Sequence, residues 1–317
     1  MKRFVVIALT AVFFILLFFK TAQGWGFWGH KKISELAVFT LPPEMFGFYK
    51  SNIGYLIAHA TAADKRRRLI PDEAPKHFLD LDHYKGGLSD LPLTLKKAEE
   101  KFGEDSLQAH GILPWSIEQQ YFLLVKAFRE RDKLGILKHS SDLAHYLADA
   151  HVPLHTTSNY NGQLTGQSGI HAFWESRIPE LFGNRYHLFT PKAHQVRNIR
   201  DEARKIIGES HAAVDSVLRI EKETAKTFPP DRQFSLQRQG RKVKQSFSES
   251  FSGAYQAGLN GMVERKLKRA ILNVGSFWYS AWVEAGQPEL VSLSEIKITE
   301  EKEKRLEIPK KIKGHED

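Results

Sequence analysis

The residues of this sequence with the clearest capacity for chemistry lie between His145 and His155, where the chain reads His-Tyr-Leu-Ala-Asp-Ala-His-Val-Pro-Leu-His. His145 and Asp149 are four residues apart, so on a helix their side chains project from one face with Cβ atoms about 5–6 Å apart. This spacing allows an imidazole and a carboxylate to bind one metal ion. Pro153 ends such a helix and can direct His155 towards the same region from another side.

A second pair repeats this spacing, because His171 and Glu175 are again four residues apart. A single histidine is more often a surface residue or a hydrogen-bonded core residue than a ligand, but two pairs and His155 together indicate more than one metal ion. The chain contains no cysteine, which excludes disulfides and thiolate zinc sites. Imidazoles that outnumber carboxylates favour zinc over calcium or magnesium.

The elements that must position these residues are predicted to be helices. Apolar residues recur at helical spacing over residues 114–133, 137–150, 191–219 and 255–285. Ser116 and Gln119 have the spacing of a capping box near the start of the first helix. Gly286 and Pro288 stop the last one. Since no sustained strand-like alternation or internal repeat is found, the fold is predicted to be all-α, a single multi-helix domain.

Two stretches between these helices are predicted to be loops. Residues 156–170 are rich in Ser, Thr, Asn, Gln and Gly and lie between the two metal-binding pairs. Residues 228–247 hold five basic residues around Phe234 and no acid after Asp231. We expect the second stretch to be a solvated loop, with contact to a polyanion as the alternative.

Composition narrows the class of protein. The chain has 317 residues, of which 42% are hydrophobic and 26% charged, close to the average of soluble globular proteins. These values argue against collagen-like, disordered and multi-spanning membrane proteins. The formal net charge of +9 allows an anionic partner without requiring one.

The start of the chain resembles a secretory signal. Two basic residues precede an apolar run over residues 4–19, and small residues before Trp25 match what signal peptidase reads. We expect cleavage and a secreted or periplasmic protein; a retained membrane anchor is the alternative. The predicted organisation is a signal peptide over 1–24, an all-α domain over 25–290 and a charged tail over 291–317.

At the level of motifs, the sequence resembles the superfamily of zinc-dependent phospholipases C and single-strand-specific secreted zinc nucleases. The run from His145 is similar to that family's central signature, His-Tyr-x-small-Asp-x-x-x-Pro-x-His, with Ala148 where glycine or threonine is usual. His171 and Glu175 resemble the following pair, with glutamate as in the phospholipases where the nucleases commonly have aspartate.

Three upstream segments extend this resemblance. Residues 62–64 (Ala-Ala-Asp) and 76–80 (Lys-His-Phe-Leu-Asp) look like the segments that supply one further carboxylate and one further imidazole. Residues 25–30 (Trp-Gly-Phe-Trp-Gly-His) resemble the family's mature N-terminus, with the short interval seen in the nucleases. The matches therefore cover residues 25–175.

The resemblance implies an all-α fold that holds three zinc ions and hydrolyses phosphate esters with zinc-bound hydroxide. The implied ligand sets are Asp64, His77, His145 and Asp149 for one ion; His155, His171 and Glu175 for a second; and the Trp25 amine and carbonyl with His30 and a shared Asp149 for a third. The terminal amine can bind only after the preceding peptide bond is cut. Asp64 is also the candidate for a catalytic general-base role.

The residues near Asp64 bear on the substrate. Choline-selective phospholipases of this family carry an aromatic residue directly after the matching carboxylate, whereas this chain has Lys65, followed by Arg66 and two more arginines. This cationic cluster favours a polyanionic substrate if it faces the cleft, and a solvated helix end is the alternative reading. Tyr160 is a candidate for stacking a base.

We therefore favour a secreted zinc nuclease acting on single-stranded nucleic acid. A zinc-dependent phospholipase C that releases phosphorylated head groups is the alternative, and a non-catalytic zinc-binding secreted protein is the second alternative. We expect a monomer and infer no stable protein partner.

Overall fold

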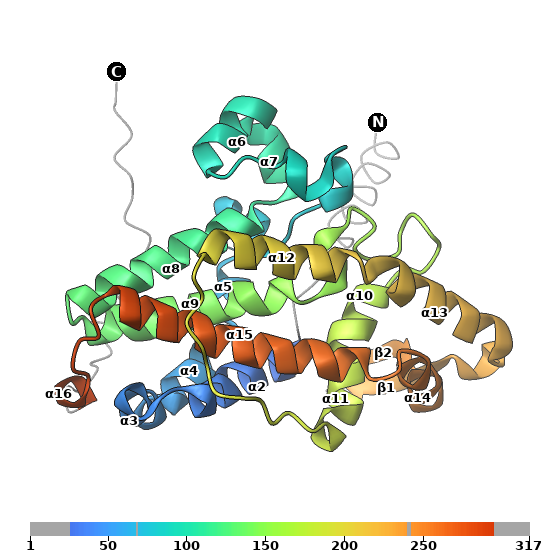
Figure 1. Cartoon of the computed structure of the whole chain (residues 1–317). Coiled ribbons are helices and arrows are strands. Elements are labelled where there is room, and N and C mark those ends of the chain that lie inside the picture. The colour runs from blue at the N-terminus through green and yellow to red at the C-terminus, as the bar shows by residue number, and fades with distance from the viewer. Residues whose placement is uncertain (1–25, 68, 240–241, 295–317) are drawn as a thin grey trace, which may run out of the picture.

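The computed structural model describes residues 26–67, 69–239 and 242–294, and their fold is all-α apart from one hairpin (Figure 1). The α-helices run over Phe27–Ala37 (α2), Pro43–Ser51 (α3), Ile53–His59 (α4), Ala62–Arg66 (α5), Leu95–Phe102 (α6), Glu104–His110 (α7), Leu113–Arg129 (α8), Lys133–Ala150 (α9), Ile170–Ala172 (α10), Ile178–Phe182 (α11), Ile199–His211 (α12), Val214–Thr227 (α13), Glu249–Gly258 (α14), Met262–Glu284 (α15) and Val291–Ser294 (α16). The predicted signal peptide over 1–24 lies outside the described residues, as do Trp25, Arg68 and residues 295–317 of the predicted tail.

Short elements connect these helices. They are Val38–Thr40 (η1), Pro71–His77 (η2), Leu81–His83 (η3), Gly87–Asp90 (η4), Pro153–Thr156 (η5), the π-helical turn Phe173–Arg177 (η6), Gly183–Arg185 (η7), Pro230–Arg232 (η8), and the strands Phe234–Gln239 (β1) and Lys242–Phe247 (β2). Among the described helices, none is long and apolar enough to span a membrane.

Helix α9 forms the centre of the fold. It packs against α8, α15 and α2, and Figure 1 shows α8, α9 and α15 side by side. Residues 130–132 link α8 to α9 in a tight turn in which Arg131 adopts a left-handed φ of 53°. Because most residues of α9 are buried, this helix can hold polar ligands in the interior only where other elements bring partners to them.

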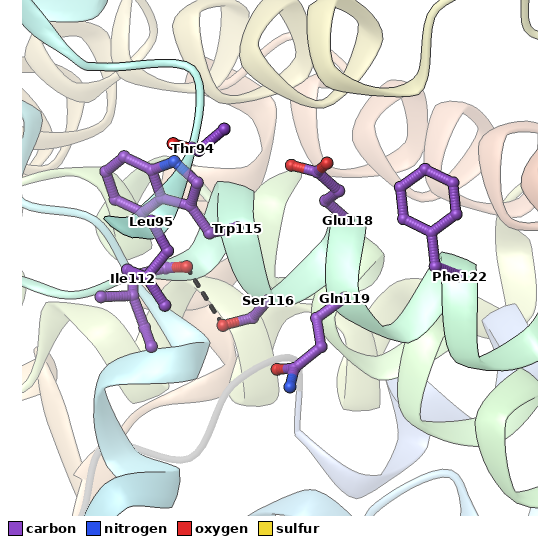
Figure 2. Close-up of a pocket in the computed structure, with 8 residues that line it drawn as sticks. All are labelled: Thr94, Leu95, Ile112, Trp115, Ser116, Glu118, Gln119 and Phe122. Carbon is purple, nitrogen blue, oxygen red and sulfur yellow. Dashed lines mark hydrogen bonds between the residues drawn. The ribbon is translucent and has the colours of Figure 1, made fainter. Parts of the chain in front are cut away.

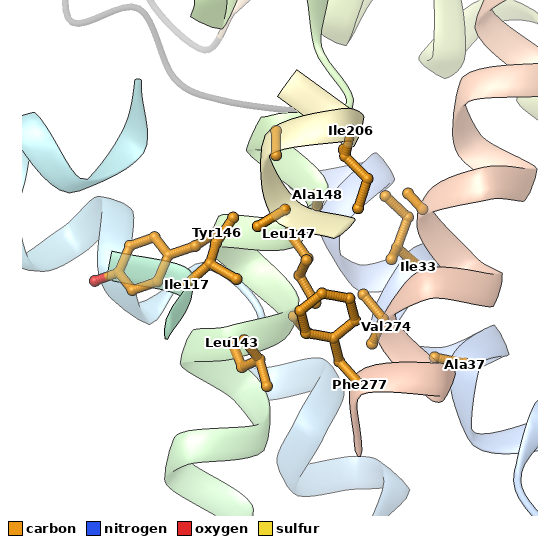
Figure 3. Packing of buried hydrophobic residues seen from close by; sticks show 14 of the residues in the cluster. Ile33, Ala37, Ile117, Leu143, Tyr146, Leu147, Ala148, Ile206, Val274 and Phe277 are labelled. Atoms are coloured by element: carbon orange, nitrogen blue, oxygen red, sulfur yellow. The ribbon is translucent and has the colours of Figure 1, made fainter. Parts of the chain in front are cut away.

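The apolar core lies between these helices. Figure 3 shows Leu143 and Leu147 of α9 packed among Ile33 of α2, Ile117 of α8 and Phe277 of α15. All five side chains are fully buried. Burial of a side chain of this size contributes about 1.5–3 kcal/mol, so this layer fixes the position of α9 relative to α2.

Helices α15 and η1 approach closely at Gly275. A Cβ atom at this position would lie 1.9 Å from Thr40 Oγ1, which itself donates a buried hydrogen bond to Ala37 O. We expect Gly275→Ala to destabilise the protein by about 1–3 kcal/mol through overpacking. The shift in the midpoint of urea unfolding measures this loss of stability. Gly253→Ala, where the added Cβ would come no closer than 4.0 Å to a neighbour, is the matched control and should not lower the unfolding midpoint.

Two of the four predicted helices need correction, whereas α8 and α9 confirm the first two within a few residues. Residues 191–198 are not helical, and α12 begins at Ile199 because the Asn198 side chain accepts hydrogen bonds from two backbone amides of its first turn. The predicted helix over 255–285 is interrupted between α14 and α15. Asn260 and Gly261, with φ of 46° and 72°, break it.

The start of α8 also differs from the prediction. The helix begins at Leu113, so Ser116 is not its N-cap but donates to Ile112 O within the first turn (Figure 2). An apolar cavity of about 300 Å³ adjoins this turn and is lined in part by Leu95, Trp115 and Phe122. It contains none of the predicted metal ligands.

Residues 156–170 form turns, as predicted, but the stretch over 228–247 contains an antiparallel hairpin instead of the predicted loop. Phe234 pairs with Phe247 at its base, and the Phe247 ring stacks on Phe173 with centroids 3.9 Å apart. This tertiary contact explains why a strongly basic segment forms strands.

Candidate metal centre

The predicted ligands within the described residues are all buried and come from many different elements. They are His30 on α2, Asp64 on α5, His77 at the end of η2, His145 and Asp149 on α9, His155 on η5, His171 on α10 and Glu175 on η6. Their donor atoms form three groups, each within 4.8 Å: His30, Asp64 and His145; His77, His145 and Asp149; and His155, His171 and Glu175. The structure thus brings together side chains that are far apart in the sequence.

The first two groups share His145 and surround Asp149, so we treat them as one first cluster. Asp149 Oδ2 lies 2.9 Å from His77 Nδ1 and 3.3 Å from His145 Nε2, and Asp149 Oδ1 lies 3.4 Å from His30 Nε2. The His30 and His145 rings stack with centroids 3.9 Å apart. Asp64 Oδ1 lies 3.7 Å from His145 Nε2. Ring nitrogens and carboxylate oxygens therefore face one common space.

The second cluster is built around Glu175. Its Oε2 atom lies 3.0 Å from His171 Nε2 and 3.4 Å from His155 Nε2. Glu175 lies on the π-helical turn η6, and such turns are frequent at functional sites. Gly26, the first described residue, lies next to Glu175, because its backbone N donates to Glu175 O over 3.1 Å. The neighbouring Trp25, predicted as a ligand, lies outside the described residues.

The ligand atoms fit a cation because they lack other partners. Within the described residues, both oxygens of Asp64, both oxygens of Glu175 and both ring nitrogens of His30 are buried without a hydrogen-bond partner. The same holds for both ring nitrogens of His171. Buried polar atoms are normally paired, and burying a carboxylate without a partner is costly. Divalent ions would satisfy these carboxylate oxygens and one nitrogen of each ring.

Backbone carbonyls orient two of the imidazoles. His145 Nδ1 donates to Ala60 O over 2.8 Å, and His155 Nδ1 donates to His77 O over 2.6 Å. In both rings this leaves Nε2 to face the carboxylates, which is the usual arrangement of a metal-binding histidine. The bond from His155 to His77 also joins the two clusters directly.

Burial sets the protonation of these groups. It raises the pKa of Glu175 to about 8 and lowers the pKa of His171 to about 3. Asp149 is also buried, but the nearby His145 and His155 hold its pKa well below the usual value. A neutral imidazole is the form that binds a metal, so the depressed pKa of His171 favours ligation.

The predicted substrate residues occupy different environments. Lys65 is exposed, and Tyr160 is 46% exposed with its ring 6.1 Å from the His171 ring. Arg66 instead turns away into ion pairs with Glu73 and Asp142. These two ion pairs indicate that Arg66 stabilises the fold, because both partners are buried carboxylates.

Arg67, one of the two arginines that follow Arg66 in the predicted cationic cluster, contacts a predicted ligand. Its Nη1 atom is 3.7 Å from Asp64 Oδ1. The positive charge of Arg67 also lowers the pKa of His171, after the larger effect of burial. The available signal was its position three residues after Asp64, which places both side chains on one helical face.

No protein-family model matches the sequence, and no curated protein matches it either. The convergence of buried imidazoles and carboxylates is therefore what indicates a metal centre in this protein. These groups could hold metal ions, whereas zinc and the number of three ions stay predictions.

Proposed function

We propose that this protein is a zinc-dependent hydrolase of phosphate esters that acts on single-stranded nucleic acid. One observation carries the proposal: a positively charged side chain lies beside the buried clusters of imidazoles and carboxylates. It is Arg67, whose Nη1 atom is 3.7 Å from Asp64 Oδ1 in the first cluster. The resemblance of the ligand motifs to the zinc phospholipase C and nuclease superfamily supports the same reaction class.

The residues have distinct parts in such a reaction. Divalent ions held by the clusters would stabilise negative charge on a phosphate and lower the pKa of a water molecule. Arg67 would bind a non-bridging phosphate oxygen and counter the charge that grows in the transition state. Asp64 has two oxygens without hydrogen-bond partners among the described residues, so one can bind an ion while the other accepts a proton.

The surroundings of the clusters favour nucleic acid over a choline lipid. Lys65 is exposed next to Asp64, where it would repel a choline head group and attract a second phosphate. Tyr160 is half-exposed next to His171 and offers a ring on which a base can stack. Both features suit a polyanion with flat bases.

Arg67→Met tests the role of the cation. We expect hydrolysis of single-stranded DNA to fall by about 10²-fold, because one charge that stabilises the transition state is lost. Metal content should not change, since Arg67 is not a ligand. Lys65→Met is the matched control, because it removes a positive charge from the residue directly after Asp64. It should lower the rate of DNA hydrolysis much less than Arg67→Met does. Equal losses in both variants would contradict the special role of Arg67.

The substrate class is tested by comparing single-stranded DNA and phosphatidylcholine as substrates of the zinc-loaded protein, each with a chelator control. Chelator-sensitive cleavage of DNA alone supports the proposal. Cleavage of the lipid alone would move the protein to phospholipase C, and no cleavage despite bound zinc would favour a non-catalytic zinc-binding protein.

A further inference from the structure

A buried carboxylate outside the ligand groups lies on the same element as His77. Glu73 is 2% exposed and precedes His77 by four residues on η2. It belongs to none of the three ligand groups. A buried carboxylate that binds no ion needs a set of donors, and those donors show what it is positioned to do.

The orientation of the His77 ring separates its two nitrogens. Nδ1 lies 2.9 Å from Asp149 Oδ2 and 3.1 Å from His145 Nε2, so this nitrogen faces the other ligands. Nε2 is buried on the opposite side of the ring and has no hydrogen-bond partner among the described residues. The carboxylate oxygen Oε1 of Glu73 lies 3.9 Å from it.

Glu73 is itself held from three directions. Tyr146 Oη and Arg66 Nη2 donate to its Oε1 over 2.5 and 2.9 Å, and Lys76 Nζ donates to its Oε2 over 3.0 Å. Tyr146 directly follows the ligand His145 on α9, so the network ties η2 to the helix that carries the first cluster. The Glu73 carboxylate is thereby fixed relative to His77.

We propose that Glu73 is a positioning residue for His77. Its Oε1 atom, 3.9 Å from Nε2, is too far away for a hydrogen bond, but its negative charge favours the tautomer that carries the proton on Nε2 and leaves Nδ1 to bind a metal. A carboxylate next to the second nitrogen of a ligating imidazole fixes its tautomer and makes the ligating nitrogen more basic. Arg66 and Lys76 then serve to keep Glu73 in place. The inference rests on metal binding at the first cluster, which the proposed function also needs, but not on any substrate.

The test compares Glu73→Gln with Asp142→Asn. Asp142 is a second buried carboxylate, 4% exposed, that accepts from the same Arg66 Nη2 over 3.0 Å. It therefore controls for loss of a charge from the network without a change next to His77. Affinities for Zn²⁺ and Co²⁺ are measured by competition with a chelator, and bound Co²⁺ is observed by its visible absorption spectrum.

We expect Glu73→Gln to weaken metal binding by about 10–100-fold at one class of sites, to leave the remaining class unchanged and to alter the Co²⁺ spectrum. Asp142→Asn should keep the affinity and spectrum of the parent protein. Parental affinity in Glu73→Gln, or an equal loss in both variants, would overturn the role of Glu73. A parent protein that binds neither metal would instead refute the metal centre and the proposed function.

A milder variant keeps the test decisive if Glu73→Gln does not fold. Tyr146→Phe removes one hydrogen bond to Glu73 Oε1 and leaves both the carboxylate and His77 in place. We expect a measurable loss of metal affinity, smaller than that of Glu73→Gln, at the same class of sites. Unchanged affinity in a folded Tyr146→Phe protein would count against the proposal.

Discussion

Asp149→Asn should remove metal from the first cluster and slow hydrolysis of single-stranded DNA by about 10³-fold or more. Asp149 is fully buried, and its two oxygens face His30, His77 and His145 at 3.4 Å or less. Asparagine keeps the shape but loses the negative charge and one oxygen ligand. Three imidazoles would then have to bind cations without the carboxylate that joins them.

The measurement is the zinc content of the purified variant, together with its rate on single-stranded DNA. His151→Gln provides a matched control. His151 is also buried and lies two residues after Asp149, but it belongs to no ligand group. Its ring bonds to Leu147 O and to Asn273 instead. His151→Gln should lower stability but keep zinc. Full zinc content in Asp149→Asn would refute the central place of Asp149.

The all-α class and helices α8 and α9 could be predicted because their apolar periodicity is long and strong. The break at Asn260 and Gly261 was missed because the apolar pattern continues through it, although the Asn-Gly pair is itself a turn signal. The antiparallel pair of strands Phe234–Gln239 and Lys242–Phe247 was missed for another reason. Its short strands are stabilised by contact of Phe247 with Phe173, a residue far away in the sequence.

Much of the candidate site follows from spacing alone, since four-residue intervals place His145 with Asp149 and His171 with Glu175. Spacing also places Arg67, three residues after Asp64, on the helical face of Asp64, but it does not show which residues Arg66 contacts. Arg66 is drawn away by Glu73 and Asp142, which come from other elements.

Glu175→Gln is expected to affect the metal-free and metal-loaded proteins in opposite directions. Glu175 is fully buried, and both its oxygens lack a hydrogen-bond partner within the described residues. Without metal, its charge is costly to bury, so the neutral glutamine should be at least as stable as glutamate. With metal bound, the carboxylate ligates and glutamate should be the more stable of the two.

The pH dependence of the metal-free proteins follows from the same burial, which raises the pKa of Glu175 from 4.5 to about 8. Between these values the unfolded chain has lost the proton that the folded protein keeps, so the parent loses stability as pH rises from about 4.5 to about 8. Glu175→Gln lacks this contribution, and its advantage over the parent should grow across that window. Thermal unfolding in chelator at several pH values measures the difference.

Glu221→Gln distinguishes a metal ligand from an ordinary buried carboxylate. Glu221 is 7% exposed, accepts a hydrogen bond from Gln167 and belongs to no ligand group. Its replacement should shift the melting temperature of the metal-free and metal-loaded proteins by the same amount, because metal binding does not involve it. If Glu175→Gln behaved in the same way, Glu175 would be a structural residue and the second cluster would not hold a metal ion.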